Sequence, residues 1–168
     1  MTDRAFFTRD VLDVAPELLG KLLCRKTADG SIVKLRISET EAYRGEEDTA
    51  CHVHKGRTKR TEVFYEEGGI LVEHLCYGMH WMLNIVTGQE EEPQAVLIRA
   101  CTEAPGPGRL TKALGITGEL NRYDLCSGGE LWLEDDGAPC RWHGEKRVGI
   151  GYAAPEDQNR LWRFVWDG

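Results

Sequence analysis

The sequence predicts an α+β fold built on an antiparallel sheet. Short segments alternate apolar and polar residues, as half-buried strands do, polar or Gly-containing turns separate them, and only brief segments have a helical period. Consecutive hairpins with few helices are typical of antiparallel α+β domains. At 168 residues, 41% of them hydrophobic, the chain is long enough for one domain with a full core, which we expect to span residues 1–168.

The N-terminal part is expected to contain one helix and two strands. Residues 13–23 predict a short helix, because Pro16 suits a first helical turn. Residues 21–26 and 31–43 predict strands joined by a Gly-containing turn. Residues 44–62 are polar and lack periodicity, so we expect a loop there.

The middle of the chain predicts a protruding hairpin and a further strand. Segments 70–76 and 80–87 predict strands on either side of Tyr77-Gly78-Met79, and a strand at 95–101 follows a polar turn. The remaining elements are expected as helices at 110–114 and 119–125 and as strands near 130–133, 147–152 and 162–166.

The net charge of −7, with a pI near 5.3, argues against a protein that binds polyanions by bulk electrostatics. The charge is segregated, however. The expected loop carries a short basic strip formed by Lys55, Arg57, Lys59 and Arg60. Local contact with a polyanion therefore stays open.

No segment predicts a membrane span or a secretory leader. No run of 18 apolar residues occurs, and the first ten residues are charged where a leader would be apolar. The six cysteines form no CxxC pair, which excludes zinc-ribbon and thioredoxin patterns, and we expect them to be reduced. The sequence thus predicts a cytoplasmic protein with no membrane partner.

The strand at 31–43 carries an anomaly. Its alternating apolar residues, from Val33 onward, are followed in register by Glu39, Glu41 and Tyr43. Burying an unpaired carboxylate is costly, so such a break needs a partner or a purpose. Two interpretations stay open: a general base acting on water, or a structural ion pair.

Two further polar residues interrupt apolar strands. Arg99 follows A-V-L-I, and a buried guanidinium needs an anionic or carbonyl partner, for which Glu41 or Glu39 is the natural candidate. Asn84 lies within M-L-N-I-V, where a buried amide must be hydrogen-bonded. Asn84 either caps a loop or contacts the polar edge of a ligand, and Arg99 by itself is explained by a salt bridge between strands.

Aromatic and imidazole side chains form a third group: Tyr43, His52, His74 and Tyr77. Tyr77 is expected at a hairpin tip, where an exposed ring can enter a nucleic-acid groove and unstack a base step. Tyr43 with a nearby histidine could form a flat slot for an aromatic ring. The alternative is that all four are ordinary packing residues.

A metal site is another interpretation of the sequence. The candidate ligands are Cys51, His52, His54, His74, Cys76 and His80. Their spacing matches no standard zinc motif. Such residues are often simply core and loop residues, so a metal-dependent hydrolase is a secondary alternative.

Several segments in order resemble the mammalian-type 3-methyladenine (alkyladenine) DNA glycosylase family. They are E-T-E-A-Y (39–43), A-C-H (50–52), G-R-T-K-R-T (56–61), Y-G-M-H-W-M-L-N-I-V-T-G (77–88), Q-A-V-L-I-R-A (94–100), G-P-G-R-L-T-K-A-L-G-I (106–116) and R-V-G-I-G (147–151). The similarity extends from about Leu18 to Phe164, and separated motifs in a fixed order are more specific than any one of them.

The resemblance implies a compact domain with a curved, split Greek-key barrel-like sheet, and a monofunctional base-excision enzyme that uses no cofactor and no metal. It implies a monomer that acts on double-stranded DNA containing damaged purines. The implied lesions are 3-methyladenine and 7-methylguanine, with hypoxanthine and ethenoadenine as further candidates. A non-catalytic module that binds damaged DNA is the main alternative.

The resemblance also implies catalytic roles. Glu41 matches the general base that activates water, and Arg99 matches the arginine that helps to hold this water. No lysine stands out as a Schiff-base nucleophile, which agrees with the absence of lyase chemistry.

The implied base pocket is formed by Tyr43 and His52, which would enclose the flipped base, and by Asn84, which would disfavour guanine by crowding its amino group. Tyr77 matches the tyrosine that fills the gap left by the flipped nucleotide. His74 departs from the family pattern, because many relatives carry a stacking tyrosine there. We expect this difference to change the range of accepted bases.

Overall fold

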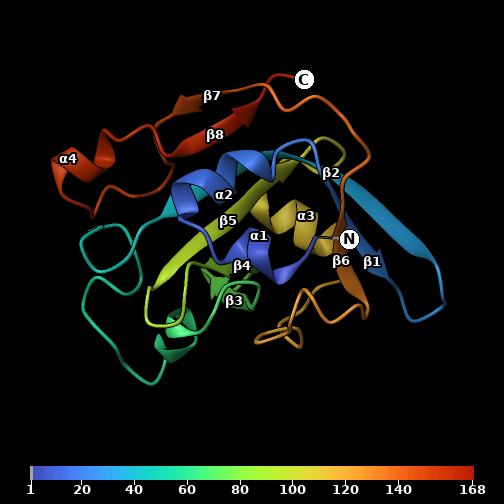
Figure 1. Cartoon of the computed structure of the whole chain (residues 1–168), viewed down its shortest axis with the longest axis horizontal. Coiled ribbons are helices and arrows are strands. Elements are labelled where there is room, and N and C mark those ends of the chain that lie inside the picture. The colour runs from blue at the N-terminus through green and yellow to red at the C-terminus, as the bar shows by residue number, and fades with distance from the viewer. Residues whose placement is uncertain (1) are drawn as a thin grey trace.

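An antiparallel sheet organises the chain, and its longest strand, β2, lies between β5 and β1 and so joins the two parts of the sheet (Figure 1). The computed structural model describes residues 2–168. The strands are β1 (Leu22–Lys26), β2 (Ile32–Tyr43), β3 (Leu71–Cys76), β4 (His80–Thr87), β5 (Gln94–Cys101), β6 (Leu131–Glu134), β7 (Trp142–Glu145) and β8 (Arg163–Trp166). Their order is β3-β4-β5-β2-β1-β6, with β8 pairing with both β2 and β7.

The helices are short. They are α1 (Arg4–Phe7), α2 (Val11–Glu17), α3 (Pro107–Ala113) and α4 (Pro155–Gln158), with a 3-10 helix η1 (Glu62–Tyr65). The sheet curls into a half-barrel, with α2 packed against β2 and β5 and α3 against β4 and β5 (Figure 1). Phe7, Leu18, Ile37, Leu83 and Leu110 are fully buried in the main core between these elements. The predicted α+β class is thereby confirmed.

A bulge in β2 changes which face its side chains occupy. Ile37 and Ala42 both belong to the main core, although they lie five positions apart and strict alternation would place them on opposite faces. The pairing with β5 is irregular between Ile37 and Thr40, which accounts for the change. The expectation that Glu41 and Tyr43 continue the apolar face of Ile37 is therefore wrong: they point to the other side of the sheet.

The first long helix begins and ends earlier in the chain than the predicted range of 13–23. Helix α2 begins at Val11, because the Asp10 side chain caps it by accepting a hydrogen bond from the Leu12 N–H at 2.9 Å. It ends before Gly20, whose φ of +82° leaves the helical region and whose N–H donates to the Ile37 carbonyl at 2.9 Å. Within residues 2–168, no helix is both long and apolar enough to cross a membrane.

Two other predicted elements are absent from the part of the chain that the structure describes. Residues 119–125 are not helical, because their backbone pairs with the edge of β3: the Leu71 N–H donates to the Tyr123 carbonyl at 2.9 Å. Residues 147–152 form a loop instead of a strand, and the Val148 N–H donates to the Glu41 carboxylate of β2 instead of to a neighbouring strand. The strand expected there lies earlier, as β7.

The long segment 44–62 is irregular, as predicted, but it is firmly packed. Cys51 and Val53 lie in a second cluster of buried residues together with Phe64 of η1 and Val86 of β4. This cluster holds the segment against the sheet, on the side to which Tyr43 points.

Candidate active site

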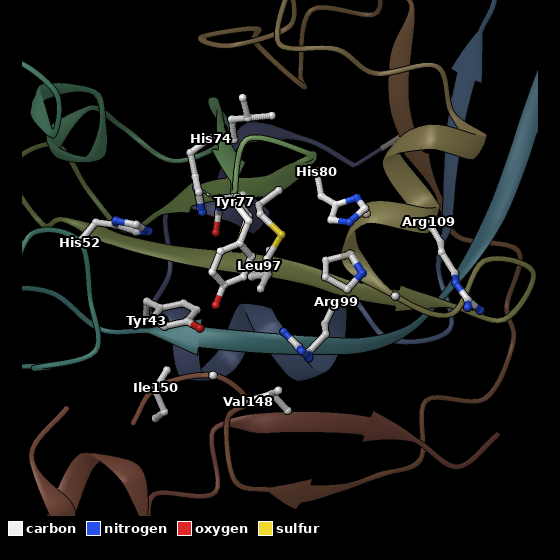
Figure 2. Close-up of a pocket in the computed structure, with 18 of the residues that line it drawn as sticks. Tyr43, His52, His74, Tyr77, His80, Leu97, Arg99, Arg109, Val148 and Ile150 are labelled. Atoms are coloured by element: carbon white, nitrogen blue, oxygen red, sulfur yellow. Dashed lines mark hydrogen bonds between the residues drawn. The ribbon is translucent and has the colours of Figure 1, made fainter. Parts of the chain in front are cut away.

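A pocket of about 780 Å³ opens on the face of the sheet that the β2 bulge exposes (Figure 2). Its walls come from β2 and β5, from the β3–β4 hairpin, from the start of α3 and from the loop after β7. Six of the residues predicted from the sequence line it: Tyr43, His52, His74, Tyr77, Asn84 and Arg99. The fold therefore brings together side chains that are up to 56 positions apart (99 − 43) in the chain.

Glu41 lies directly behind the pocket wall and is fully buried. Its Oε1 accepts a hydrogen bond from the Tyr43 hydroxyl at 2.8 Å, and its Oε2 accepts one from the Val148 N–H at 2.8 Å. The Arg99 Nε lies 3.5 Å from Oε2. These groups compensate the cost of burying a carboxylate. All three partners line the pocket, so Glu41 lies immediately next to it.

The two carboxylates predicted as candidates have different partners. Arg99 was expected to pair with either Glu41 or Glu39, and it pairs with Glu41. Glu39 binds Arg163 at 2.7 Å instead. Glu39 is half-buried and does not line the pocket. The structure thus separates a site carboxylate from one that ties β2 to β8.

Tyr43 serves as both a hydrogen-bond donor and an aromatic wall. Burial, reinforced by the Glu41 charge, raises the pKa of the Tyr43 hydroxyl well above its usual value, so that it remains a donor. The Arg147 guanidinium lies 5.1 Å from the Tyr43 ring centroid. Figure 2 shows Tyr43 and Arg99 pointing into the pocket, with Val148 and Ile150 closing its far side.

Two neutral imidazoles form another part of the wall. Burial, together with the neighbouring His52 and Arg60, lowers the pKa of His74 to about 4. Partial burial, with Arg60, also lowers the pKa of His52. The rings of His52 and His74 meet edge to face at 4.7 Å, and Nδ1 of His74 lies 3.3 Å from Nδ2 of Asn84. At neutral pH this wall is aromatic and uncharged.

The tip of the β3–β4 hairpin exposes apolar side chains. Tyr77 is 92% exposed and Met79 74% exposed. Tyr77 has a φ of +53° and is followed by Gly78 at +66°, values of a tight hairpin turn. An exposed apolar tip of this kind indicates a contact surface.

Comparison with known proteins assigns the chain to a family. The family described as methylpurine-DNA glycosylase (MPG) matches residues 5–105 and 102–168. A protein from Borreliella afzelii (strain PKo), provisionally named 3-methyladenine DNA glycosylase, is 44% identical over 183 residues, which cover 99% of this chain and 96% of that one. A DNA-3-methyladenine glycosylase from Arabidopsis thaliana is 43% identical over 185 residues, covering 95% of this chain and 69% of that one.

The chain belongs to the methylpurine-DNA glycosylase family. It is therefore a hydrolytic DNA glycosylase of DNA repair, and it acts on DNA. The sequence resemblance named the mammalian type of this family. These relatives are bacterial and plant proteins, and they do not distinguish that type from others.

The basic strip of this glycosylase is only partly available for DNA. Lys55, Lys59 and Arg60 are exposed. Arg57 instead pairs with two carboxylates, those of Glu62 at 2.5 Å and of Glu91. Its charge is offset within the protein, so the predicted phosphate contact of Arg57 has no support in its surroundings. Arg60 is close enough to the pocket to affect the pKa of His74.

Two residues of this glycosylase have a place in the site that the sequence did not predict. Val148 acts through its backbone, and His80, considered from the sequence only as a metal ligand, lines the pocket with Arg109 beside Gly108. A Cβ on Gly108 would lie 2.7 Å from the His80 ring, so only glycine fits there. The signals available were the motifs 106–116 and 147–151, which carried the family resemblance but no assigned role.

The candidate metal ligands do not converge. Within residues 2–168, no group of three or more His, Cys, Asp or Glu side chains is arranged to hold a metal ion. His54 instead places its Nδ1 2.8 Å from the Glu46 carbonyl oxygen. The metal-dependent hydrolase considered from the sequence thus lacks a ligand set in the described part of the chain.

Proposed function

We propose that this glycosylase flips an alkylated purine out of duplex DNA into the pocket and hydrolyses its N-glycosidic bond with a water activated by Glu41. The observation that carries this proposal is the placement of Glu41 immediately behind the pocket with Arg99 beside it. A carboxylate oxygen has two lone pairs, and one protein donor binds each oxygen of Glu41 at 2.8 Å. A lone pair on each oxygen remains for water.

Arg99 is proposed to orient that water. Its Nε lies 3.5 Å from Glu41, which is too long for a good hydrogen bond, so its N–H groups are available to a further acceptor. Glu41 would take the proton of the water, and its charge would stabilise the cationic sugar that forms as the base leaves.

The uncharged aromatic wall supports N-alkylated purines as substrates, with 3-methyladenine and 7-methylguanine as the main candidates. These bases are cationic, so they are good leaving groups, and their electron-poor rings attract an aromatic face. Tyr43, His52 and His74 supply such faces without a positive charge that would repel the base. Hypoxanthine and ethenoadenine are neutral, so they would need protonation before they leave.

Tyr77 is proposed to fill the space that the flipped nucleotide leaves in the duplex. It is the most exposed of the large hydrophobic residues and borders the pocket. Inserting an aromatic wedge is a known way to offset the cost of unstacking a base. In the part of the chain described, no lysine lines the pocket, which agrees with hydrolysis without lyase activity.

We also propose that the protein acts as a monomer in the cytoplasm, at the nucleoid if its source is bacterial. The six cysteines are free, as suits a reducing compartment.

Replacing Glu41 by Gln tests the proposal. The Glu41→Gln variant should bind a duplex containing 7-methylguanine as the original protein does, while release of free base falls by roughly 100-fold or more. Glu39→Gln is the matched control, because Glu39 lies on the same strand but binds Arg163 outside the pocket. Base release should be measured by chromatography under single-turnover conditions.

Undiminished release by Glu41→Gln would show that Glu41 is not the base. If the original protein binds the damaged duplex but releases no base, the alternative of a non-catalytic damage-binding module is correct instead.

A further inference from the structure

The catalytic scheme above leaves a fully buried ion pair unused, that of Arg147 and Asp48. Their side chains are 0% and 1% exposed. The contact is bidentate: Nη1 donates to Oδ2 at 2.6 Å and Nη2 donates to Oδ1 at 3.0 Å. The Nε of Arg147 is buried without a partner. A buried guanidinium with an unsatisfied donor is costly, so its presence calls for an explanation.

The Arg147 guanidinium connects the segments that build the site. Besides Asp48, it donates to the carbonyl oxygens of Ala42 at 2.9 Å and of Asp157 at 3.2 Å. It also lies over the rings of Tyr43 and Trp162, 5.1 Å from each centroid. One side chain therefore joins the end of β2, the segment that leads to His52 and the loop after β7.

Asp48 also accepts several hydrogen bonds. In addition to Arg147, its Oδ2 accepts from the Arg44 N–H at 3.0 Å and its Oδ1 accepts from the Ala50 N–H at 3.0 Å. Both carboxylate oxygens are thus fixed by backbone donors. The pair has one defined geometry, which an apolar contact of the same volume would not impose.

The positions of these contacts in the chain indicate their role. Ala42, whose carbonyl Arg147 binds, lies between Glu41 and Tyr43, and Arg147 is bonded directly to Val148. The Val148 N–H and the Tyr43 hydroxyl donate the two hydrogen bonds that the Glu41 carboxylate accepts. Arg147 therefore holds the chain on both sides of Glu41 without touching it.

We infer that Arg147, locked by Asp48, is a positioning residue for the Glu41 base. It holds the Val148 N–H and the Tyr43 hydroxyl against the carboxylate, so that the remaining lone pairs of Glu41 face the pocket. This inference rests on the proposed function of Glu41. A lysine cannot replace the guanidinium, because a single ammonium cannot bind Asp48, Ala42 and Asp157 in the same fork geometry.

The test compares Arg147→Lys with the original protein in the release of 7-methylguanine from duplex DNA. We expect kcat to fall at least tenfold while the Kd for the damaged duplex changes less than threefold. The pH–rate profile should also shift, because the proposed base loses a well-placed donor. All rates are measured at a temperature where circular dichroism shows the variant to be folded.

Arg4→Lys is the matched control. Arg4 is also a clamping arginine, which binds Asp124 at 2.5 Å and the Gly68 carbonyl at 3.0 Å, but none of its partners lines the pocket. It should lower stability without moving the pH–rate profile. If Arg147→Lys does not fold, Asp48→Asn, which keeps the volume and removes the charge, should give the same shift and loss of kcat.

A folded Arg147→Lys or Asp48→Asn variant with unchanged kcat and an unchanged pH–rate profile would overturn the inference. So would a loss of activity that matches the loss of folded protein. Failure of the proposed function is a different result, in which the original protein itself releases no base.

Discussion

The orientation of the Asn84 amide depends on one neighbour, His74. The lone pair of an amide nitrogen is delocalised into the carbonyl group and does not accept hydrogen bonds, so in the 3.3 Å contact Asn84 Nδ2 donates and His74 Nδ1 accepts. His74 then carries its proton on Nε2, and its pKa of about 4 keeps this neutral form through the physiological range. His74 thus fixes the direction of a polar group that borders the base pocket.

Substituting His74 should therefore alter the discrimination that Asn84 is proposed to exert against an exocyclic amino group. In His74→Phe the ring remains but the acceptor is lost, and the preference for 7-methylhypoxanthine over 7-methylguanine should fall by about tenfold, the value of one hydrogen bond. His74→Asn can place an oxygen where Nδ1 lies and should keep the preference. The measurement is the ratio of kcat/KM on duplexes that differ only in that amino group.

An equal ratio in His74→Phe and in the original protein would show that Asn84 is held without His74. A loss in both variants would assign the effect to the ring itself and not to its Nδ1 acceptor.

Single residues of the site were predictable where a side chain broke a pattern. Arg99 and Asn84 interrupt apolar strands, and both line the pocket. Val148 was not predictable in this way, because it contributes its N–H and any residue except proline has one. Arginine is usually a surface residue, and only the folded chain shows that Arg147 is buried.

At the scale of elements, the bulge in β2 determines which face carries the site. Alternation predicted a strand over 31–43, and a strand is present at Ile32–Tyr43. The change of face was not predictable, because it arises where β2 pairs with β5 on one side and β8 on the other. These partners are distant in sequence, and no local pattern records them.

Strand β3 contains another buried carboxylate, Glu73, which the site does not use. It is 6% exposed, and neither of its carboxylate oxygens has a hydrogen-bond partner. Burial, together with the charge of Glu119, raises its pKa to about 7. Because the pKa is raised in the folded state, the folded protein binds the proton more tightly than the unfolded chain, and stability is lost as pH rises from about 4.5 through 7.

Glu73→Gln should remove this pH dependence. At pH 8 the variant should be more stable than the original protein by roughly 2 kcal/mol, which corresponds to a Tm about 4–8 °C higher for a chain of this size. At pH 5, where Glu73 is protonated, the two should have similar Tm values. The measurement is thermal unfolding at both pH values, with the exposed Glu67→Gln as a control that should show no such difference. The same Tm gap at pH 5 and pH 8 would contradict this account.

For the whole molecule, the main electrostatic question is how a protein of net charge −7 binds a polyanion. Arg57, in the middle of the strip, is neutralised by Glu62 and Glu91. Binding should therefore depend on a small number of local contacts, and it should weaken steeply as salt rises.

This makes the salt dependence of binding a test of which basic residues contact DNA. Replacing Lys55, Lys59 and Arg60 together by Ala should weaken binding and should reduce the slope of log K against log salt by up to about 2.7, at roughly 0.9 per phosphate contact. Arg57→Ala should leave the slope unchanged, because its charge is already paired. Binding is measured by fluorescence anisotropy in the Glu41→Gln background, which prevents turnover. An unchanged slope in the triple variant would move the DNA contact away from this strip and toward Arg109 and Lys112 at α3.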